Sequence, residues 1–259
     1  MSWSLLSFAL PAFGLLKVFA QSNPASYKKF DDMPQSDQAA AINAILERVL
    51  NAENVQGSEH FERTEDMLKE LPDSAGPKTI QSLLRYRLKV VKTETDDFPV
   101  FATGTDAQAG KYYIGVKPDP EVEPSLPWVV THELSHILND DQLTLGIAKT
   151  IASLGMAALS TFVLGWSLLP SLGAVIVTNC VTHTVCSQRA ERAADDFAIK
   201  HCSREQLEKG IAFFELIKAR RASGTYTNNL ITCILHPSEN SRIAKIRAAL
   251  GLAGKAKLA

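Results

Sequence analysis

The sequence lacks a surplus of charge of either sign. Its 259 residues include 27 Lys and Arg and 28 Asp and Glu, so the formal net charge is −1 at pH 7. A protein that binds a phosphate backbone needs a basic surplus to neutralise phosphates and release counterions. The balance of charge therefore argues against nucleic acid as a partner. The length suits one domain with a substantial core, with or without membrane-contacting segments, and is short for two domains.

Cysteine is also scarce, and its spacing is uninformative. The four cysteines form no Cys-X-X-Cys pair and are too few for a disulfide scaffold. We expect all four to be buried thiols in a reducing compartment, which favours a cytoplasmic domain. They are Cys180, Cys186, Cys202 and Cys233.

Charge is nearly absent from two long stretches, of which the first is the N-terminal segment. Residues 1–20, MSWSLLSFALPAFGLLKVFA, are interrupted only by Lys17 and have a marginal length for crossing a bilayer. We interpret them as an anchor or an interfacial helix, with a cleaved signal or a soluble packing helix as alternatives. Residues 21–37 are polar, contain two prolines and are predicted to be a linker.

The second stretch lies in the middle of the chain. Between residues 145 and 177 the only charged residue is Lys149, and the sequence GWSLLPSLG at 165–173 resembles a turn. The two arms of the run are each slightly shorter than the roughly 20 residues of a full span. Residues 145–186 are therefore predicted to form an apolar helical hairpin, inserted or partly inserted in a membrane. The alternative is a pair of core helices in a soluble protein.

Three short segments before this hairpin are rich in β-branched and aromatic residues and are separated by turn-forming residues. They are LKVVKT at 88–93, FPVFATG at 98–104 and KYYIGV at 111–116. The pattern predicts a small antiparallel sheet, whereas most of the remaining chain has helical periodicity. We therefore expect an α+β, mainly helical fold, with one domain at residues 38–259.

The motif HELSH at residues 132–136 places two histidines four residues apart on a predicted helix. Positions i and i+4 share a helix face, with Cβ atoms about 5–6 Å apart, so His132 and His136 can bind one metal ion. Glu133 lies about 100° further around the helix, where it can reach a water on that ion without ligating the metal. The spacing predicts a hydrolytic metal site with Glu133 as general base. The alternative is a surface helix with a chance match.

A third metal ligand must come from elsewhere in the chain. No acidic residue occurs between Asp141 and Glu191, which leaves Glu191 or a distant histidine such as His183. Glu191 begins the sequence ERAAD, in which Asp195 lies four residues later on the same helical face. From there Asp195 can accept the free N–H of a ligand imidazole, with His132 as the expected partner, and fix its tautomer.

The alternative for this acidic segment is a solvated edge of the helix. In that arrangement the carboxylates, including Asp196, would pair with Arg189 or Arg192 and contribute little to stability.

The combined motifs resemble the HtpX-like and CAAX-prenyl-protease-type zinc metallopeptidases, a gluzincin family. The resemblance covers roughly residues 85–250, and the small number of apolar segments favours the simpler HtpX-like layout. It implies a zincin-like domain in which an apolar hairpin separates two zinc-binding helices. The matching segments are HELSHILNDD at 132–141, RAERAADDFA at 189–198 and HPSENSRIAKI at 236–246.

The resemblance also implies the roles of the site residues. One zinc ion per chain would be held by His132, His136 and Glu191, and Glu133 would be the catalytic base. Asp195 would hydrogen-bond to a ligand side chain without contacting the ion.

The resemblance also implies roles for two residues of the His-Pro segment. The resemblance places His236 near the active site, where it can approach the metal or stabilise an oxyanion. It implies that Arg242 anchors the same loop.

We thus expect a zinc-dependent endopeptidase that hydrolyses proteins at a membrane, in quality control or processing. The strand YYIG at 112–115, if it is an exposed sheet edge, can hold an extended peptide by β-augmentation. Lys28 and Lys29 place the catalytic domain on the cytoplasmic face by the positive-inside tendency, with a periplasmic or secreted enzyme as alternative. A soluble or exported metallopeptidase and a catalytically inactive membrane scaffold stabilised by metal are the competing interpretations.

Overall fold

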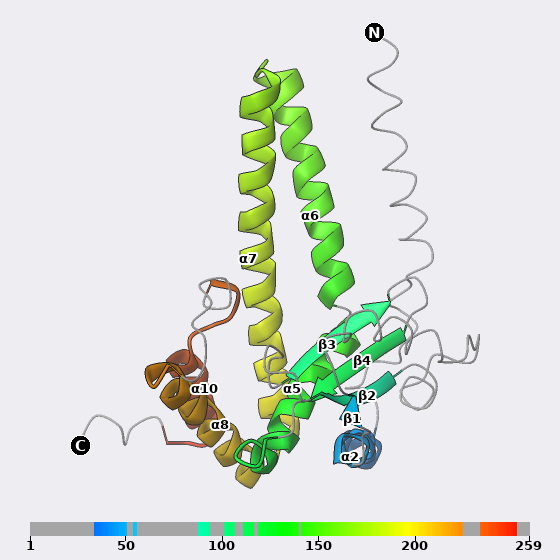
Figure 1. The fold of residues 1–259 in the computed structure, drawn as a ribbon, viewed down its shortest axis with the longest axis vertical. Helices are drawn as coiled ribbons and strands as arrows, with labels where there is room; N and C mark the ends of the chain where they lie inside the picture. Colours follow the sequence, from blue (N-terminus) through cyan, green and yellow to red (C-terminus); the bar gives the residue numbers. More distant parts are fainter. Residues whose placement is uncertain are drawn as a thin grey trace. The chain divides into compact units, whose positions relative to one another are not determined.

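The computed structural model describes eight ranges of the chain: residues 34–50, 54–55, 88–93, 101–106, 111–116, 119–139, 141–224 and 234–252. The predicted apolar segment at the N-terminus and most of the predicted linker lie outside these ranges. Figure 1 labels the helices and strands. The described residues fall into two compact units, one within residues 1–118 and 137–140, and one within residues 119–136 and 141–259.

The first unit contains helix α2 (Gln35–Leu50) and a small sheet. Helix α2 buries Ala41, Ile42 and Ile45, whose spacing of one, three and four residues places them on one helical face. This face explains why the segment forms a helix, and α2 packs against strand β2 of the sheet.

The sheet is mixed rather than antiparallel throughout. Its order is β1-β2-β4-β3; β3 pairs antiparallel with β4, and β2 pairs parallel with both β4 and β1. The predicted antiparallel arrangement is therefore wrong for β2, because periodicity identifies a strand but does not determine its neighbour. The strands are β1 (Asn54–Val55), β2 (Leu88–Thr93), β3 (Phe101–Asp106) and β4 (Lys111–Val116).

Strand β4 lies inside this sheet. Ile114 is paired with Val90 of β2 on one side and with Thr103 of β3 on the other. The expectation that residues 112–115 form an exposed edge for a peptide is therefore wrong, because both neighbours already occupy their backbone groups. Among the described strands, β1 and β3 form the edges.

The second unit contains residues 126–136 of helix α5 (Leu126–Asn139), which follows the 3₁₀ turn η3 (Glu123–Ser125). Trp128 of α5 is 1% exposed and meets Phe214 edge to face, with ring centroids 6.2 Å apart. Phe214 belongs to α8 (Arg204–Ala222), which also supplies the backbone at Gly210 for close packing against the indole ring.

Helix α10 (Glu239–Ala249) completes this core by burying Ile243 and Ile246. Its N-terminus is fixed by Ser238, whose side chain accepts a hydrogen bond from the backbone N–H of Ser241. The helix begins directly after the His-Pro segment, so its first turns follow His236 closely along the chain.

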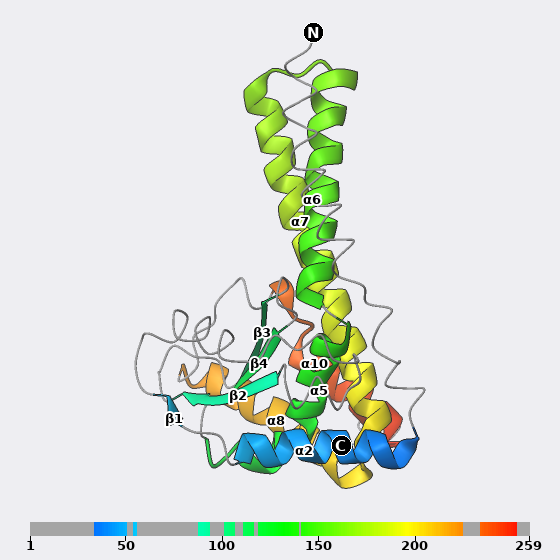
Figure 2. The same cartoon turned by 90° about the vertical axis from the view of Figure 1, so that its right-hand side faces the viewer.

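The apolar hairpin consists of α6 (Asp141–Ala158) and α7 (Leu168–His201), which lie side by side in Figures 1 and 2. A π-helical turn, η4 (Leu159–Val163), extends the first arm. The chain then reverses at Gly165, whose φ of 63° is a left-handed conformation that glycine adopts without steric cost.

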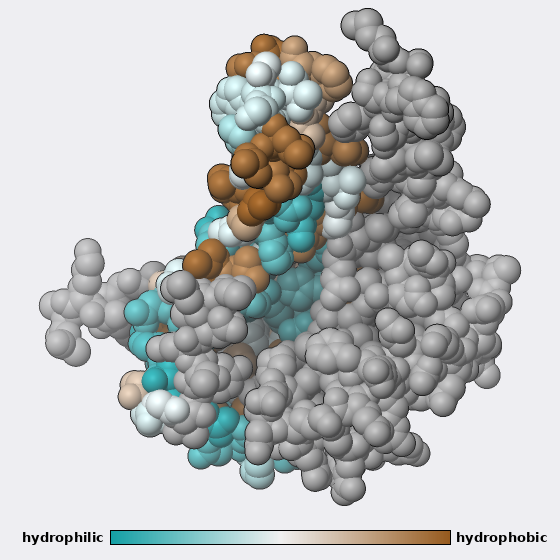
Figure 3. Space-filling model, turned by 45° about the horizontal axis from the view of Figure 1, so that its top comes forward, coloured by the Kyte–Doolittle hydropathy of each residue, from teal (hydrophilic) through white to brown (hydrophobic). Residues whose placement is uncertain are grey.

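Both arms are long and apolar enough to cross a membrane, by length and composition. In each arm only 6% of the most apolar window is buried, whereas core helices of a soluble protein are mostly buried. Within the described part of the chain, this low burial favours a membrane-contacting hairpin over two core helices. Figure 3 shows hydrophobic residues gathered over the outer part of the hairpin. The exposed large side chains include Phe162, Val163, Leu168, Leu169, Ile176, Val177, Val181 and Val185.

The cysteines differ from the expectation of buried thiols. Cys180 is exposed, and Cys186 and Cys202 are half-buried; none of these three forms a disulfide. The expectation is therefore wrong for Cys180, which lies on the exposed part of α7. Cys233 lies outside the described residues.

Candidate metal centre

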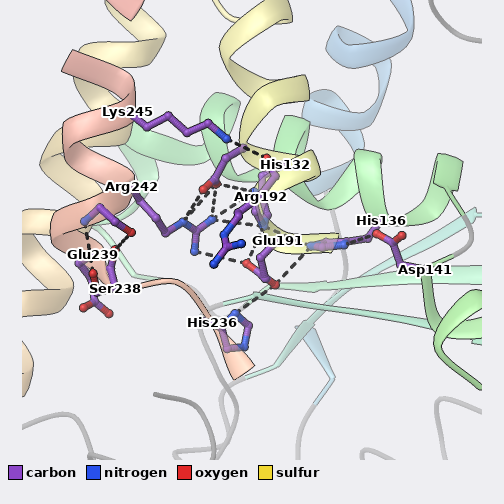
Figure 4. A network of polar contacts seen from close by, with 12 residues as sticks. His132, His136, Asp141, Glu191, Arg192, His236, Ser238, Glu239, Arg242 and Lys245 are labelled. Carbon is purple, nitrogen blue, oxygen red and sulfur yellow. Dashed lines mark hydrogen bonds and ion pairs between the residues drawn. The ribbon is translucent and has the colours of Figure 1, made fainter. Parts of the chain in front are cut away.

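Helices α5 and α7 bring two histidines and a glutamate together, as Figure 4 shows. His132 Nε2 lies 3.2 Å from His136 Nε2 and 3.4 Å from Glu191 Oε2, and His136 Nε2 lies 3.5 Å from Glu191 Oε1. One ligand atom from each residue falls within 4.8 Å of the others, so the group could hold a metal ion. Two imidazole nitrogens and one carboxylate form a donor set that suits zinc.

The local sequence of each helix explains this arrangement. Helix α5 turns its i and i+4 histidines to one side, and His132 is only 6% exposed. Helix α7 buries a stripe at Glu191, Ala194, Asp195 and Ala198, whose spacing follows one helical face. The stripe turns the carboxylates of ERAAD inward, toward the histidines.

Asp195 lies behind His132, in the position expected from the ERAAD spacing. Its Oδ1 is 3.2 Å from His132 Nδ1, and Asp195 is 2% exposed. Asp195 pairs with Arg242, so the alternative of a solvated edge pairing with Arg189 or Arg192 is wrong for this carboxylate. The outward-facing Asp196 pairs instead with Lys245, at 2.9 Å.

Arg242 contacts the metal-binding cluster directly. Its Nε and Nη2 donate to the two Asp195 oxygens at 3.0 and 2.6 Å, and its Nη1 lies 3.4 Å from Glu191 Oε2. The guanidinium also packs over the Phe214 ring, 4.3 Å from its centroid. Arg242 therefore joins both α7 carboxylates, a contact that the sequence motif did not reveal.

His236 and His183 have different positions relative to the cluster. His236 Nδ1 lies 3.0 Å from Glu191 Oε1, and its side chain is 44% exposed at the edge of the group. His183 precedes Glu191 by eight residues on α7, a rise of about 12 Å along the helix. His183 is not in the metal-binding group, so it is not the third member.

Glu133 is half-buried on α5, beside the two histidines in sequence. Its negative charge is close enough to raise the pKa of His136. Glu133 is therefore near enough to the histidine pair to act on it electrostatically.

Asp141 is a member of the network that the sequence motifs did not identify. Its Oδ2 lies 2.7 Å from His136 Nδ1. The signal available in the sequence was an acidic residue five positions after the second histidine. That spacing does not place Asp141 on the same helix face as His136, because Asp141 begins the next helix, α6.

The electrostatics of the cluster favour positive charge. Burial alone would lower the pKa of both imidazoles, but the surrounding carboxylates outweigh it. Hydrogen bonds with Asp141 and Glu191 raise the pKa of His136 to about 10. Asp195 and Glu191 raise the pKa of His132 against burial and the opposing charge of Arg242. A largely buried cluster that stabilises added positive charge fits a divalent cation.

A mainly helical domain with a buried His-His-Glu group has the features of a metallopeptidase. Residues 90–250 match the model of Peptidase family M48, which is more than half of the chain. The chain therefore belongs to peptidase family M48, and the predicted resemblance to zinc metallopeptidases of this type is confirmed. No curated protein and no solved structure matches the chain.

Proposed function

We propose that this protein is a zinc-dependent endopeptidase that acts on proteins at a membrane. The observation that supports the proposal most directly is the group of His132, His136 and Glu191, in a chain of a peptidase family. These three side chains would hold the zinc ion and leave a coordination position open. When bound, zinc would polarise the peptide carbonyl and make a water molecule acidic near neutral pH.

The side chains around the group then have distinct proposed roles. Glu133 accepts a proton from the attacking water and delivers it to the leaving amine, as general acid–base catalysis requires. His236 is exposed enough to face a substrate and can donate a hydrogen bond to the oxyanion. Asp195 and Arg242 hold His132 and Glu191 in place, which reduces the cost of assembling the site.

We assign these elements to a gluzincin, zincin-like domain at residues 38–259. Its hairpin, predicted at residues 145–186, lies along the chain between the helix that carries the two histidines and the position of Glu191. Such an order along the chain requires both ends of the hairpin to lie on the side of the metal centre. The domain limits follow from the sequence pattern and are part of the proposal.

Membrane association is supported by the exposed apolar side chains of the hairpin and by its length. Exposing so much apolar surface to water is unfavourable, at about 25 cal/mol per Å², whereas lipid accepts it. We further propose that residues 1–20 form an anchor and that the domain lies on the cytoplasmic face, because Lys28 and Lys29 follow that segment. Unfolded or damaged membrane-associated polypeptides would then be the substrates.

The test compares the native chain with Glu133→Gln, both purified in detergent with zinc quantified. We expect Glu133→Gln to bind zinc like the native chain and to cleave casein at least 100-fold more slowly, because the base contributes about 10²–10⁴-fold. Glu208→Gln is the matched control, since Glu208 is exposed on α8 and pairs with Arg204. Equal cleavage by the native chain and Glu133→Gln rejects the mechanism. Absence of cleavage by a native chain that holds zinc favours the inactive scaffold.

A further inference from the structure

His136 has a short contact that the proposed mechanism does not use. Its Nδ1 lies 2.7 Å from Asp141 Oδ2, and the two side chains are 14% and 21% exposed. The contacts of its other nitrogen are longer: Nε2 lies 3.2 Å from His132 Nε2 and 3.5 Å from Glu191 Oε1. Asp141 is therefore the closest polar partner of this imidazole within the described cluster.

The two nitrogens of His136 face different surroundings. A neutral imidazole carries a proton on one nitrogen and a lone pair on the other. A carboxylate accepts hydrogen bonds and cannot donate one when ionised, so Asp141 selects the tautomer with the proton on Nδ1. The lone pair of Nε2 then points toward His132 and Glu191, where a metal ion would be held.

His132 has similar carboxylate neighbours, although Arg242 Nη2 also lies 3.2 Å from its Nδ1. Its Nδ1 lies 3.2 Å from Asp195 Oδ1, and its Nε2 lies 3.4 Å from Glu191 Oε2. Each histidine thus has a carboxylate at Nδ1 and the shared glutamate near Nε2. The two outer carboxylates come from different arms of the hairpin: Asp141 is the first residue of α6, and Asp195 lies on α7.

We propose that Asp141 is a positioning residue of the metal centre. It accepts the N–H of His136 Nδ1, fixes the tautomer and ring orientation of His136, and keeps Nε2 available to the ion. This inference rests on the proposed function, in which His136 is a zinc ligand. It makes the first turn of α6 part of the metal centre.

A different role for Asp141 gives a different experimental result. An acidic residue in the first turn of a helix stabilises that helix through its dipole. That role lowers the stability of the metal-free protein when Asp141 is replaced, but it leaves the zinc affinity of the folded protein unchanged. Zinc affinity therefore separates a positioning residue from a residue that only supports α6.

The experiment measures zinc affinity of the full-length protein in detergent, by competition with a chromophoric chelator at fixed pH. Asp141→Asn keeps the size of the side chain but removes the carboxylate, and we expect its zinc dissociation constant to rise about 10- to 100-fold. Asp196→Asn is the matched control, because Asp196 is exposed and pairs with Lys245 outside the cluster. We expect no change for the control. The absorption spectrum of the cobalt-substituted protein should shift for Asp141→Asn alone.

The outcomes distinguish the two levels of the proposal. A native chain that binds no zinc rejects the proposed function, and the role of Asp141 with it. A native chain that binds zinc, together with an Asp141→Asn chain of equal affinity and equal cobalt spectrum, rejects the positioning role only. If Asp141→Asn does not fold, Asp141→Glu replaces it, since it keeps the charge but displaces the carboxylate. Native-like zinc affinity in that variant also overturns the inference.

Discussion

Arg242 and Asp195 form a two-point ion pair directly behind His132. The guanidinium donates from Nε to Oδ2 at 3.0 Å and from Nη2 to Oδ1 at 2.6 Å, and the same carboxylate faces His132 Nδ1 at 3.2 Å. A planar fork fixes a carboxylate in one orientation, which a single ammonium group cannot do. The orientation of His132 therefore depends on a residue of α10, far along the chain.

Replacing Arg242 by Gln should destabilise the protein by about 3–5 kcal/mol, because Asp195 is left as a buried charge without its partner. Arg247→Gln provides the control, since Arg247 pairs with Glu215 at the surface and should cost about 1 kcal/mol or less. The free energy of unfolding from urea titrations in detergent measures both. Equal losses in the two variants would show that the buried pair carries no special weight.

Replacing Gly210 by Ala should also destabilise the protein. A Cβ at this position would lie 2.7 Å from Cδ2 of Trp128, so the indole ring or helix α8 must move. Overpacking costs about 1–3 kcal/mol, and helix propensity offsets at most about 1 kcal/mol of it, so we expect a net loss of stability. Gly146→Ala is the matched control, because nothing lies within 4 Å of its Cβ position. In thermal unfolding followed by circular dichroism, Gly210→Ala should have a lower midpoint than the native chain and Gly146→Ala. Any other order of midpoints would contradict the close packing of Gly210 against Trp128.

The ion pair between Asp119 and Arg220 predicts a pH dependence of stability. The hydrogen bond from Arg220 holds the pKa of Asp119 below its usual value in the folded state. The pair therefore stabilises the protein fully above the unfolded-state pKa, near 3.9, and its contribution is lost as the pH falls through the lower folded-state pKa. At pH 7 the free energy of unfolding of the native protein should exceed that of Asp119→Asn by about 2 kcal/mol.

The measurement for this pair is urea unfolding of both proteins between pH 7 and pH 3. The difference between them isolates Asp119 from other groups that titrate in the same range. It should stay constant down to about pH 5 and then shrink. A difference that is independent of pH, or one that grows in acid, would contradict the direction of the pKa shift.

Zinc removal should lower both activity and stability. A chelator is expected to abolish casein cleavage, and zinc at about 100 times its dissociation constant should restore about 2.7 kcal/mol of stability. Glu191→Gln should lose most of this zinc-dependent shift in the thermal midpoint, whereas His183→Gln should keep it. The opposite result, with His183 needed and Glu191 dispensable, would move the third ligand to another part of α7.

The hairpin should hold the protein in a membrane. Native chain expressed in cells should remain in the membrane pellet after carbonate extraction. Val177→Lys places a charge on the exposed apolar face of α7, at a cost of about 2.5–3.5 kcal/mol in hydrocarbon, and should increase the extracted fraction. Ala219→Lys, exposed on α8, should have no effect. Complete extraction of the native chain would mean that another surface covers the hairpin.

The sequence by itself determined the parts of the site that depend on local geometry. The spacing of HELSH places His132 and His136 on one helical face, and the spacing in ERAAD does the same for Glu191 and Asp195. The long run between these motifs, in which Lys149 is the only charge between residues 145 and 177, likewise indicated a helical hairpin. These inferences succeed because the period of a helix is set by the backbone within a few residues.

Only the tertiary structure decided which elements meet. It brings Glu191 rather than His183 to the histidines. It also places Arg242 in contact with Glu191 and Asp195, and Asp141 in contact with His136. It also inserts β4 between β2 and β3. Periodicity fixes which face of an element is turned inward, whereas the neighbour of that face depends on contacts between residues far apart in the chain. The spacing of residues within one element does not predict those contacts.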